Sequence, residues 1–292
     1  MRAGRRSSRW RAEVRRRVCF WLIEIALAAA LLAWALWANK ALVLTRFELR
    51  SARLPAAFEG FKIAQVSDLH NAVFGEGNSK LLALLREAEP DIVAVTGDLV
   101  DSRHTDIDAA VAFVEAAAEI APVYCVTGNH EARLDFGEIE ARLEAAGAVV
   151  LRNEAVHIER GGEEIRLAGI DDPAFVRTGG SAAGRAEREL AELPDDGAYT
   201  VLLAHRPELA ELYAEYGADA VLSGHAHGGQ VRLPLLGGLY APGQGLLPEY
   251  DAGVYELGGT SLVVSRGLGS SVFPLRINNR PELVLITLKC EK

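Results

Sequence analysis

Five short apolar runs in this chain each end at polar residues, and this repeated pattern constrains the fold more than any other feature. The runs are rich in Val, Ile, Leu or Ala and are bounded by Gly or Pro, which predicts strands buried on both faces. In open α/β sheets ligands bind at the carboxyl ends of strands, so we expect these side chains to converge on one cleft. The runs are FKIAQV before Asp68 and His70, DIVAVTG before Asp98, PVYCVTG before Asn129 and His130, TVLLA before His205, and ADAVLSG before His225 and His227.

Helical patterns alternate with these runs. Apolar residues at three- and four-residue spacings, followed by Pro or Gly at several ends, predict helices. From Ala148 the pattern changes to alternating strands, and after Gln230 the chain is mostly turn and strand. The whole pattern predicts an α/β fold with two sheets face to face, the second more antiparallel than the first, and with helices outside. The predicted helices span 79–89, 107–120, 138–146, 185–193 and 207–216.

The N-terminal region has an apolar run at 18–38 whose only charged residue is Glu24. At ~1.5 Å rise per residue this run crosses a hydrocarbon core of about 30 Å, which predicts a single transmembrane helix. Eight arginines within 1–17 predict a basic cytoplasmic tail and a body outside the cytoplasmic membrane. A cleaved signal peptide is the alternative, because Ala-x-Ala triplets occur inside the run. A connector at 39–60, which alternates like an edge strand, precedes a body at 61–292.

Charge and cysteine content limit the classes of partner. The chain of 292 residues has a formal net charge of −9 although its tail is basic, so the body is acidic. An acidic body argues against nucleic acid as a partner. The three cysteines, Cys19, Cys125 and Cys290, have no CxxC spacing, so the sequence predicts neither a thiolate metal site nor a disulfide framework.

The polar residues after the five runs offer carboxylate, amide and imidazole donors, a set that suits Mn, Fe or Zn. Seven such donors are too many for one ion with open coordination positions, but they suit two divalent metal ions that share a bridging carboxylate. Two cations about 3.5 to 4 Å apart activate a bridging hydroxide and neutralise phosphoryl oxygens, so we expect hydrolysis of a phosphoester. The predicted donors are Asp68, His70, Asp98, Asn129, His205, His225 and His227.

Taken together, the motifs resemble those of the calcineurin-like metallophosphoesterases. They read DLH at Asp68, GDLVD at Asp98, GNHE at Asn129, a single His205 after a strand, and GHAH at His225, in the order of that family. One such motif is a weak signal, whereas five in order, each after a strand, are specific. The segments GHAHGGQVRLP and SRGLG and the N-terminal apolar helix resemble its bacterial membrane-associated YaeI-like or YkuE-like branch. The resemblance implies the family's four-layer sandwich of two mixed β-sheets flanked by helices, here a metallophosphoesterase domain over residues 61–292.

The resemblance also implies roles for single residues. Asp98 would bridge the two ions. His130 would protonate the leaving-group oxygen, oriented by Asp101. Hydroxide would attack in line with the leaving oxygen, without a covalent enzyme intermediate. The remaining ligands would divide into Asp68, His70 and His227 on one ion and Asn129, His205 and His225 on the other.

These features predict a membrane-tethered phosphodiesterase that acts on lipid- or envelope-linked phosphoesters, because the tether holds the cleft near the bilayer. Two alternatives stay open: a hydrolase that resembles UDP-2,3-diacylglucosamine pyrophosphatases, which needs a cytoplasmic body, and a non-catalytic metal-binding scaffold. Loops at 171–182 and 235–250 are expected to select the substrate.

Several other polar residues have plainer interpretations. Glu131 is expected to bond backbone groups near the site. His104 could line the cleft, although a solvated loop suits it better, and His157 is expected at the surface. The candidates for contact with a substrate phosphate, because a guanidinium fits one, are Arg206, Arg266 and Arg276.

Overall fold

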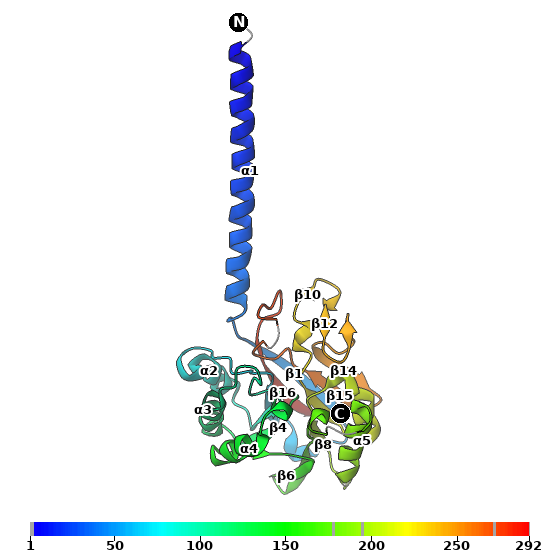
Figure 1. Cartoon of the computed structure of the whole chain (residues 1–292). Helices are drawn as coiled ribbons and strands as arrows, with labels where there is room; N and C mark the ends of the chain where they lie inside the picture. The colour runs from blue at the N-terminus through cyan, green and yellow to red at the C-terminus, as the bar shows by residue number, and fades with distance from the viewer. Residues whose placement is uncertain (1–2, 177–178, 194–195, 271–272, 292) are drawn as a thin grey trace.

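The computed structural model describes residues 3–176, 179–193, 196–270 and 273–291. Within them most of the strands form two six-stranded sheets, whose orders are given below (Figure 1). The first contains β1 (Val43–Ser51), β2 (Lys62–Val66), β3 (Ile92–Thr96), β4 (Val123–Val126), β5 (Ala148–Val150) and β16 (Glu282–Cys290). The second contains β6 (Glu154–Arg160), β7 (Glu163–Gly169), β8 (Thr200–Leu203), β9 (Ala220–Ser223), β14 (Gly253–Leu257) and β15 (Thr260–Val264). Their orders are β1-β16-β2-β3-β4-β5 and β14-β15-β9-β8-β7-β6.

Each helix predicted in the body is present, with ends shifted by a few residues. The α-helices are α1 (Ala3–Ala38), α2 (Ser79–Ala88), α3 (Ile107–Ala118), α4 (Phe136–Ala145), α5 (Ala182–Glu192) and α6 (Ala210–Tyr216). The 3-10 helices are η1 (Ala56–Phe58), η2 (Glu76–Asn78), η3 (Glu131–Arg133), η4 (Pro173–Phe175), η5 (Pro207–Leu209) and η6 (His227–Gly229). Two small ribbons pair β10 (Arg232–Leu233) with β11 (Gly237–Gly238) and β12 (Tyr240–Ala241) with β13 (Gly245–Leu246).

Three groups of buried apolar side chains separate four layers. The two sheets share a core that contains Ile63 of β2 and Val201 of β8. On the outer face of the first sheet, α2 and α3 contribute Leu85 and Phe113 to a second core. On the outer face of the second sheet, α6 contributes Tyr213 to a third. The predicted arrangement of two mixed sheets face to face between helices is therefore confirmed.

The last strand corrects one detail of the prediction. We expected the late strand segments to build a more antiparallel second sheet, but β16 lies in the first sheet, parallel to β1 and antiparallel to β2. Its residues from Glu282 to Ile286 are all buried, so this apolar run requires neighbours on both sides and both faces. The second sheet is parallel from β7 to β9 and on to β15, and antiparallel only at its two end pairs.

The N-terminal helix α1 extends away from the body (Figure 1). Its part from Glu13 to Ala38 is long and apolar enough to cross a membrane, and the most apolar window of that part is 0% buried against the rest of the chain. The helix begins at Ala3, so most of the basic tail is helical too, while residues 1–2 lie outside the described residues. The connector contributes β1, an edge strand of the first sheet, as its alternation predicted.

Candidate metal centre

The predicted donors come together where the two sheets present the carboxyl ends of their parallel strands. Strands β2, β3 and β4 are parallel neighbours in the first sheet, and β8 and β9 are parallel neighbours in the second. Gln65 links the two ends, since its amide nitrogen donates to the Thr96 hydroxyl at 3.1 Å and to the Ser223 carbonyl at 2.9 Å. The cleft is thus built from the strand ends of two facing sheets, whereas the sequence pattern predicted the strand ends of one sheet.

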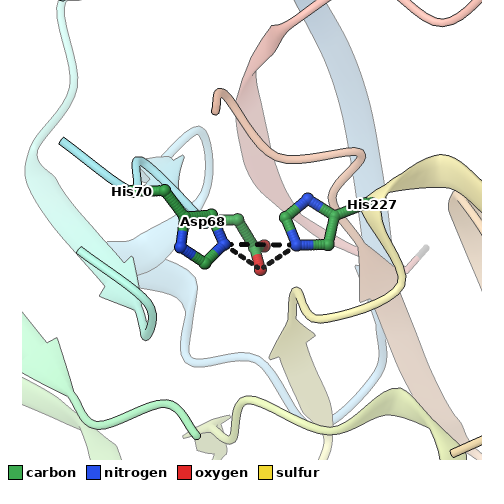
Figure 2. A group of neighbouring side chains, drawn as sticks. All are labelled: Asp68, His70 and His227. Atoms are coloured by element: carbon green, nitrogen blue, oxygen red, sulfur yellow. Dashed lines mark hydrogen bonds and ion pairs between the residues drawn. The ribbon is translucent and has the colours of Figure 1, made fainter. Parts of the chain in front are cut away.

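A first group of donors consists of Asp68, His70 and His227, which point toward one another (Figure 2). The Nε2 atoms of the two histidines are 3.2 Å apart. His227 Nε2 lies 3.4 Å from Asp68 Oδ1, and His70 Nε2 lies 3.9 Å from the same oxygen. All three residues are buried.

A second group consists of Asp98, His205 and His225. His205 Nε2 lies 3.1 Å from His225 Nδ1 and 3.3 Å from Asp98 Oδ2. His205 Nδ1 is 2.8 Å from the Thr96 carbonyl, so Nδ1 carries a hydrogen and Nε2 is the nitrogen that faces the group. Asp98 Oδ2 also lies 3.6 Å from His70 Nε2 of the first group, so one carboxylate oxygen faces both groups.

The donor set fits bound cations. In each group two imidazole nitrogens and a carboxylate oxygen lie within 4.8 Å of one another, close enough to bind one cation. Asn129 lines the same cleft, and its buried Oδ1 has no hydrogen-bond partner among the described residues. Buried polar atoms are normally paired, so these atoms indicate a ligand. Oxygen and imidazole donors without sulfur suit a divalent transition metal.

Burial sets the charge state of most of these imidazoles. Burial lowers the pKa of His70 to about 4 and that of His227 to about 3, and it holds the pKa of His225 well below its usual value. These rings are therefore neutral near pH 7, the form in which imidazole binds a metal. At His205 the burial effect is outweighed by the Asp98 carboxylate, which raises the pKa of His205 to about 10. The neighbouring histidines likewise outweigh burial at Asp98 and hold its pKa well below the usual range.

The backbone of the centre is held in unusual conformations by hydrogen bonds. The His225 N–H donates to both carboxylate oxygens of Asp68 at 3.1 Å, and the His130 N–H donates to Asp98 Oδ1 at 2.8 Å. Left-handed conformations in non-glycine residues concentrate at functional sites when the surroundings enforce them. Those of the centre, with their φ values, are Asp68 (51°), His70 (46°), Asp98 (51°), His225 (63°) and His227 (49°).

Two glycines allow the loops to approach one another. A Cβ on Gly97 would stand 2.6 Å from His205 Nδ1, and a Cβ on Gly224 would stand 1.9 Å from the Ser67 hydroxyl. Gly97 requires glycine for two reasons, a φ of +91° and the lack of room for a side chain. At Gly224 only the close approach of neighbouring atoms excludes a side chain.

Glu131 organises the loop after β3, as predicted. Its carboxylate accepts hydrogen bonds from the backbone N–H groups of Asp98 at 3.0 Å, Val100 at 2.9 Å and Gly128 at 2.9 Å. Burial, together with the nearby Asp98, raises the pKa of Glu131 to about 7. This residue therefore supports the proposed ligands without facing the cleft.

His130 lines the cleft beside the first group of donors, with its ring centroid 4.5 Å from that of His70. Its Nδ1 lies 3.3 Å from Asp101 Oδ1. The Ser102 backbone N–H points at the same Nδ1 from 3.1 Å, and the Ser102 hydroxyl lies 3.2 Å from it. Sequence reasoning missed Ser102, and adjacency to Asp101 was the only signal that could have indicated it.

The cleft has a volume of about 560 Å³ and a cationic rim. Of the three arginines proposed from the sequence, only Arg206 lines it, held by Asp172 through Nε–Oδ2 and Nη2–Oδ1 distances of 2.7 and 3.0 Å. Arg266 instead pairs with Glu282, and the buried Arg276 donates to backbone carbonyls. Two further rim cations, which the sequence analysis did not identify, are Arg103 and Arg133.

The remaining sequence candidates lie away from the centre. His104 is exposed and does not line the cleft, and the half-exposed His157 pairs with Asp196 at 2.7 Å. Both loops expected to select the substrate do reach the cleft, through Ala174 in one and Tyr240 in the other. Residues 177–178 of the first loop lie outside the described residues.

Comparison with known proteins gives a consistent result. The family model of calcineurin-like phosphoesterases matches residues 61–229. The chain is 31% identical to the metallophosphoesterase YkuE of Bacillus subtilis over 253 residues, which cover 84% of this chain and 85% of that protein. It is 32% identical to the phosphodiesterase YaeI of Escherichia coli over 237 residues, which cover 78% of this chain and 82% of that protein.

Among solved structures, the sulfate thiohydrolase SoxB of Thermus thermophilus superposes with a TM-score of 0.50 and 15% sequence identity. The superposition covers 81% of this chain and 57% of that one. At this level of identity the similarity concerns the fold alone, and it agrees with the layered arrangement described above.

Proposed function

The chain belongs to the calcineurin-like phosphoesterase family and is therefore a metal-dependent hydrolase of phosphoester bonds; we propose that it cleaves phosphodiesters at a centre for two divalent ions. One observation carries the proposal. Asp98 Oδ2 lies 3.3 Å from His205 Nε2 and 3.6 Å from His70 Nε2, so a single carboxylate oxygen can serve two neighbouring cations.

In this proposal the Asp98 carboxylate would hold both ions, and the chemistry of the donors suits Mn, Fe or Zn. When bound, two such ions polarise phosphoryl oxygens and lower the pKa of water. The carboxamide oxygen of Asn129 would complete the second group. The proposed ligands are Asp68, His70 and His227 for one ion and Asn129, His205 and His225 for the other.

His130 acts as the proton donor to the leaving-group oxygen. The Ser102 N–H and Asp101 Oδ1 both lie next to its Nδ1, so the ring is held at Nδ1 and Nε2 is the nitrogen left to donate to the substrate. An imidazole suits the role because its ordinary pKa lies near neutrality. Asp101 is a positioning residue in this scheme, since it acts through His130.

The arginine rim binds the non-bridging oxygens of the substrate. A guanidinium presents a planar fork of donors that matches phosphate geometry. Of the three arginines, Arg206 has the most fixed position, because its guanidinium forms an ion pair with Asp172. Arg103 and Arg133 are exposed and adapt to the rest of the substrate.

Helix α1 anchors the enzyme in the cytoplasmic membrane, with the basic tail inside and the body outside. Protease added to intact cells or spheroplasts should then digest the body. Complete protection of the body, with digestion only after lysis, would support the cytoplasmic alternative that resembles UDP-2,3-diacylglucosamine pyrophosphatases.

The full-length protein in detergent provides the enzymatic test. We expect two equivalents of metal per chain by elemental analysis and manganese-stimulated hydrolysis of bis-p-nitrophenyl phosphate. Two bound equivalents without any turnover of this diester, or of other diesters in a panel, would instead identify a metal-binding scaffold.

A further inference from the structure

Two small ribbons next to the cleft expose leucines that the fold does not require. The ribbon patch consists of four exposed leucines: Leu235 and Leu236 in the turn between β10 and β11, Leu246 in β13, and Leu247 directly after β13. Leu235 and Leu247 have φ values of 69° and 53°, in the left-handed region where glycine is favoured. Leucine at such positions is costly for the backbone, and exposed apolar side chains gathered on two ribbons joined through the Leu247 N–H and the Leu239 carbonyl mark an interaction site.

Both ribbons lie on the side of the body from which α1 leaves (Figure 1). Hydrogen bonds fix this relation, because the Asn39 side chain at the foot of α1 donates to the Arg276 carbonyl at 3.1 Å and accepts from the Arg276 N–H at 2.8 Å. The same loop is joined to the first ribbon, where the Arg232 N–H donates to the Ile277 carbonyl at 3.0 Å. The ribbon patch therefore has a defined position relative to α1.

The foot of α1 carries the residues that mark a membrane–water interface. Trp37, in the last turn of the helix, is 60% exposed, and the Arg280 guanidinium lies 5.5 Å from its ring centroid. Trp and Arg are preferred at this level of a bilayer. Arg280 also donates to the carbonyls of Ala41 and Leu42 at 2.8 Å, which holds the helix foot against the body.

We infer that the ribbon patch is a second membrane contact, which inserts its leucines into the interface of the same bilayer that α1 crosses. Tyr240 and Phe273 connect this contact to the chemistry, because both are about half exposed and both line the cleft that contains His130. Resting on the proposed function, the inference assigns the substrate class: an amphiphilic phosphodiester, whose apolar chain leaves the cleft over these two rings toward the bilayer.

Lipid quenching tests the contact without any measurement of activity. The full-length chain, with Cys19→Ser and Cys290→Ser, is labelled with a bimane at Leu236→Cys and reconstituted into vesicles of phosphatidylethanolamine and phosphatidylglycerol. We expect doxyl-labelled lipid in these vesicles to quench the probe strongly.

The matched control is Val149→Cys, an exposed apolar position in β5, at the edge of the first sheet opposite β1. Equal quenching at both positions, or no quenching at Leu236→Cys, would overturn the inference.

Paired chromogenic substrates test its consequence for catalysis. Hexadecyl p-nitrophenyl phosphate in the vesicles and soluble bis-p-nitrophenyl phosphate share a leaving group and differ in the alkyl chain. The double variant Leu235→Glu, Leu236→Glu should lower turnover of the alkyl diester by at least about tenfold and leave that of the soluble diester unchanged, since neither leucine lines the cleft. An unchanged rate with the alkyl diester would refute the assigned substrate class. If the unmodified enzyme hydrolyses neither diester, the proposed function has failed, and the quenching result still decides the membrane contact.

Discussion

The metal centre and the ribbon patch both hold non-glycine residues in the left-handed conformation, but they stabilise it differently. In the centre, Asp68 and Asp98 are buried, and their carboxylates accept hydrogen bonds from the backbone of neighbouring loops. In the ribbons, Leu235 and Leu247 expose their side chains to solvent. Strain that the surrounding protein enforces indicates an internal site, whereas strain at an exposed apolar turn indicates something outside the protein.

Removal of the shared carboxylate tests the centre most severely. Asp98→Asn retains an oxygen for the His130 N–H but removes the negative charge that faces His70 and His205. We expect the rate of bis-p-nitrophenyl phosphate hydrolysis to fall more than about 100-fold, which exceeds the loss typical for residues that only hydrogen-bond to metal ligands. Elemental analysis should also show loss of metal.

Asp106→Asn is the matched control, because Asp106 caps α3 and asparagine caps equally well. This control should retain full activity and metal content. Full metal content in Asp98→Asn would contradict the bridging role.

His130→Ala separates chemistry from metal binding within the same centre. If His130 donates the proton to the leaving group, kcat should fall by about 100-fold or more while metal content stays unchanged. A diester with a nitrophenolate leaving group needs less help from a proton donor than a dialkyl diester, whose leaving group is an alkoxide, so the decrease should be smaller for the nitrophenyl diester. Equal decreases for both substrates, or simultaneous loss of metal, would assign His130 to another role.

The strand-end donors were predictable because each lies next to a local signal. An apolar run of strand length followed by Asp, Asn or His is visible within about ten residues, and five such runs limit the fold to an α/β arrangement. The predicted helices are present for the same reason, since periodicity is local. The structure brings six of the seven predicted donors into two compact groups and places Asn129 in the same cleft.

The division of strands between two sheets was not predictable from such signals. Strand β16 reads like any buried run, and only non-local packing places it between β1 and β2. The rim cations Arg103 and Arg133 were missed because no sequence pattern distinguishes an exposed arginine at the rim from any other exposed arginine. The position of the ribbons beside the foot of α1 likewise depends on contacts across more than two hundred residues, such as that between Asn39 and Arg276.

Glu189 tests the assumption that an unpaired buried atom marks a ligand. Its Oε2 has no hydrogen-bond partner among the described residues, although it lies on α5 outside the centre. Burial, then Asp171 and Asp172, raises the pKa of Glu189 to about 7. A raised carboxyl pKa means that the folded state binds the proton more tightly, so stability is highest at acid pH and is lost as pH rises from about 4.5 to about 7.

Glu189→Gln should therefore unfold like the unmodified protein near pH 4.5 and be more stable by about 1 kcal/mol at pH 8, after allowance for partial solvent screening. Urea unfolding at the two pH values measures the difference. A variant that is less stable at pH 8 would show that the Glu189 carboxylate has a cationic partner. The Oε2 atom of Glu189 would then not count as an unpaired buried atom.

The smallest expected effect distinguishes the two kinds of strain most directly. A left-handed leucine costs about 1 kcal/mol, and the greater freedom of glycine in the unfolded chain cancels part of the gain from replacing it. Leu235→Gly should therefore raise the thermal stability of the detergent-solubilised protein slightly. Leu246→Gly, at an exposed leucine outside the set of positive-φ residues, should lower it by about 0.5 kcal/mol.

Opposite signs of the two stability changes mean that the fold gains nothing from leucine at position 235, so that its apolar side chain serves a contact outside the protein. Destabilisation by both variants would show that Leu235 packs usefully within the turn, and the contrast with Asp68 and Asp98 would disappear.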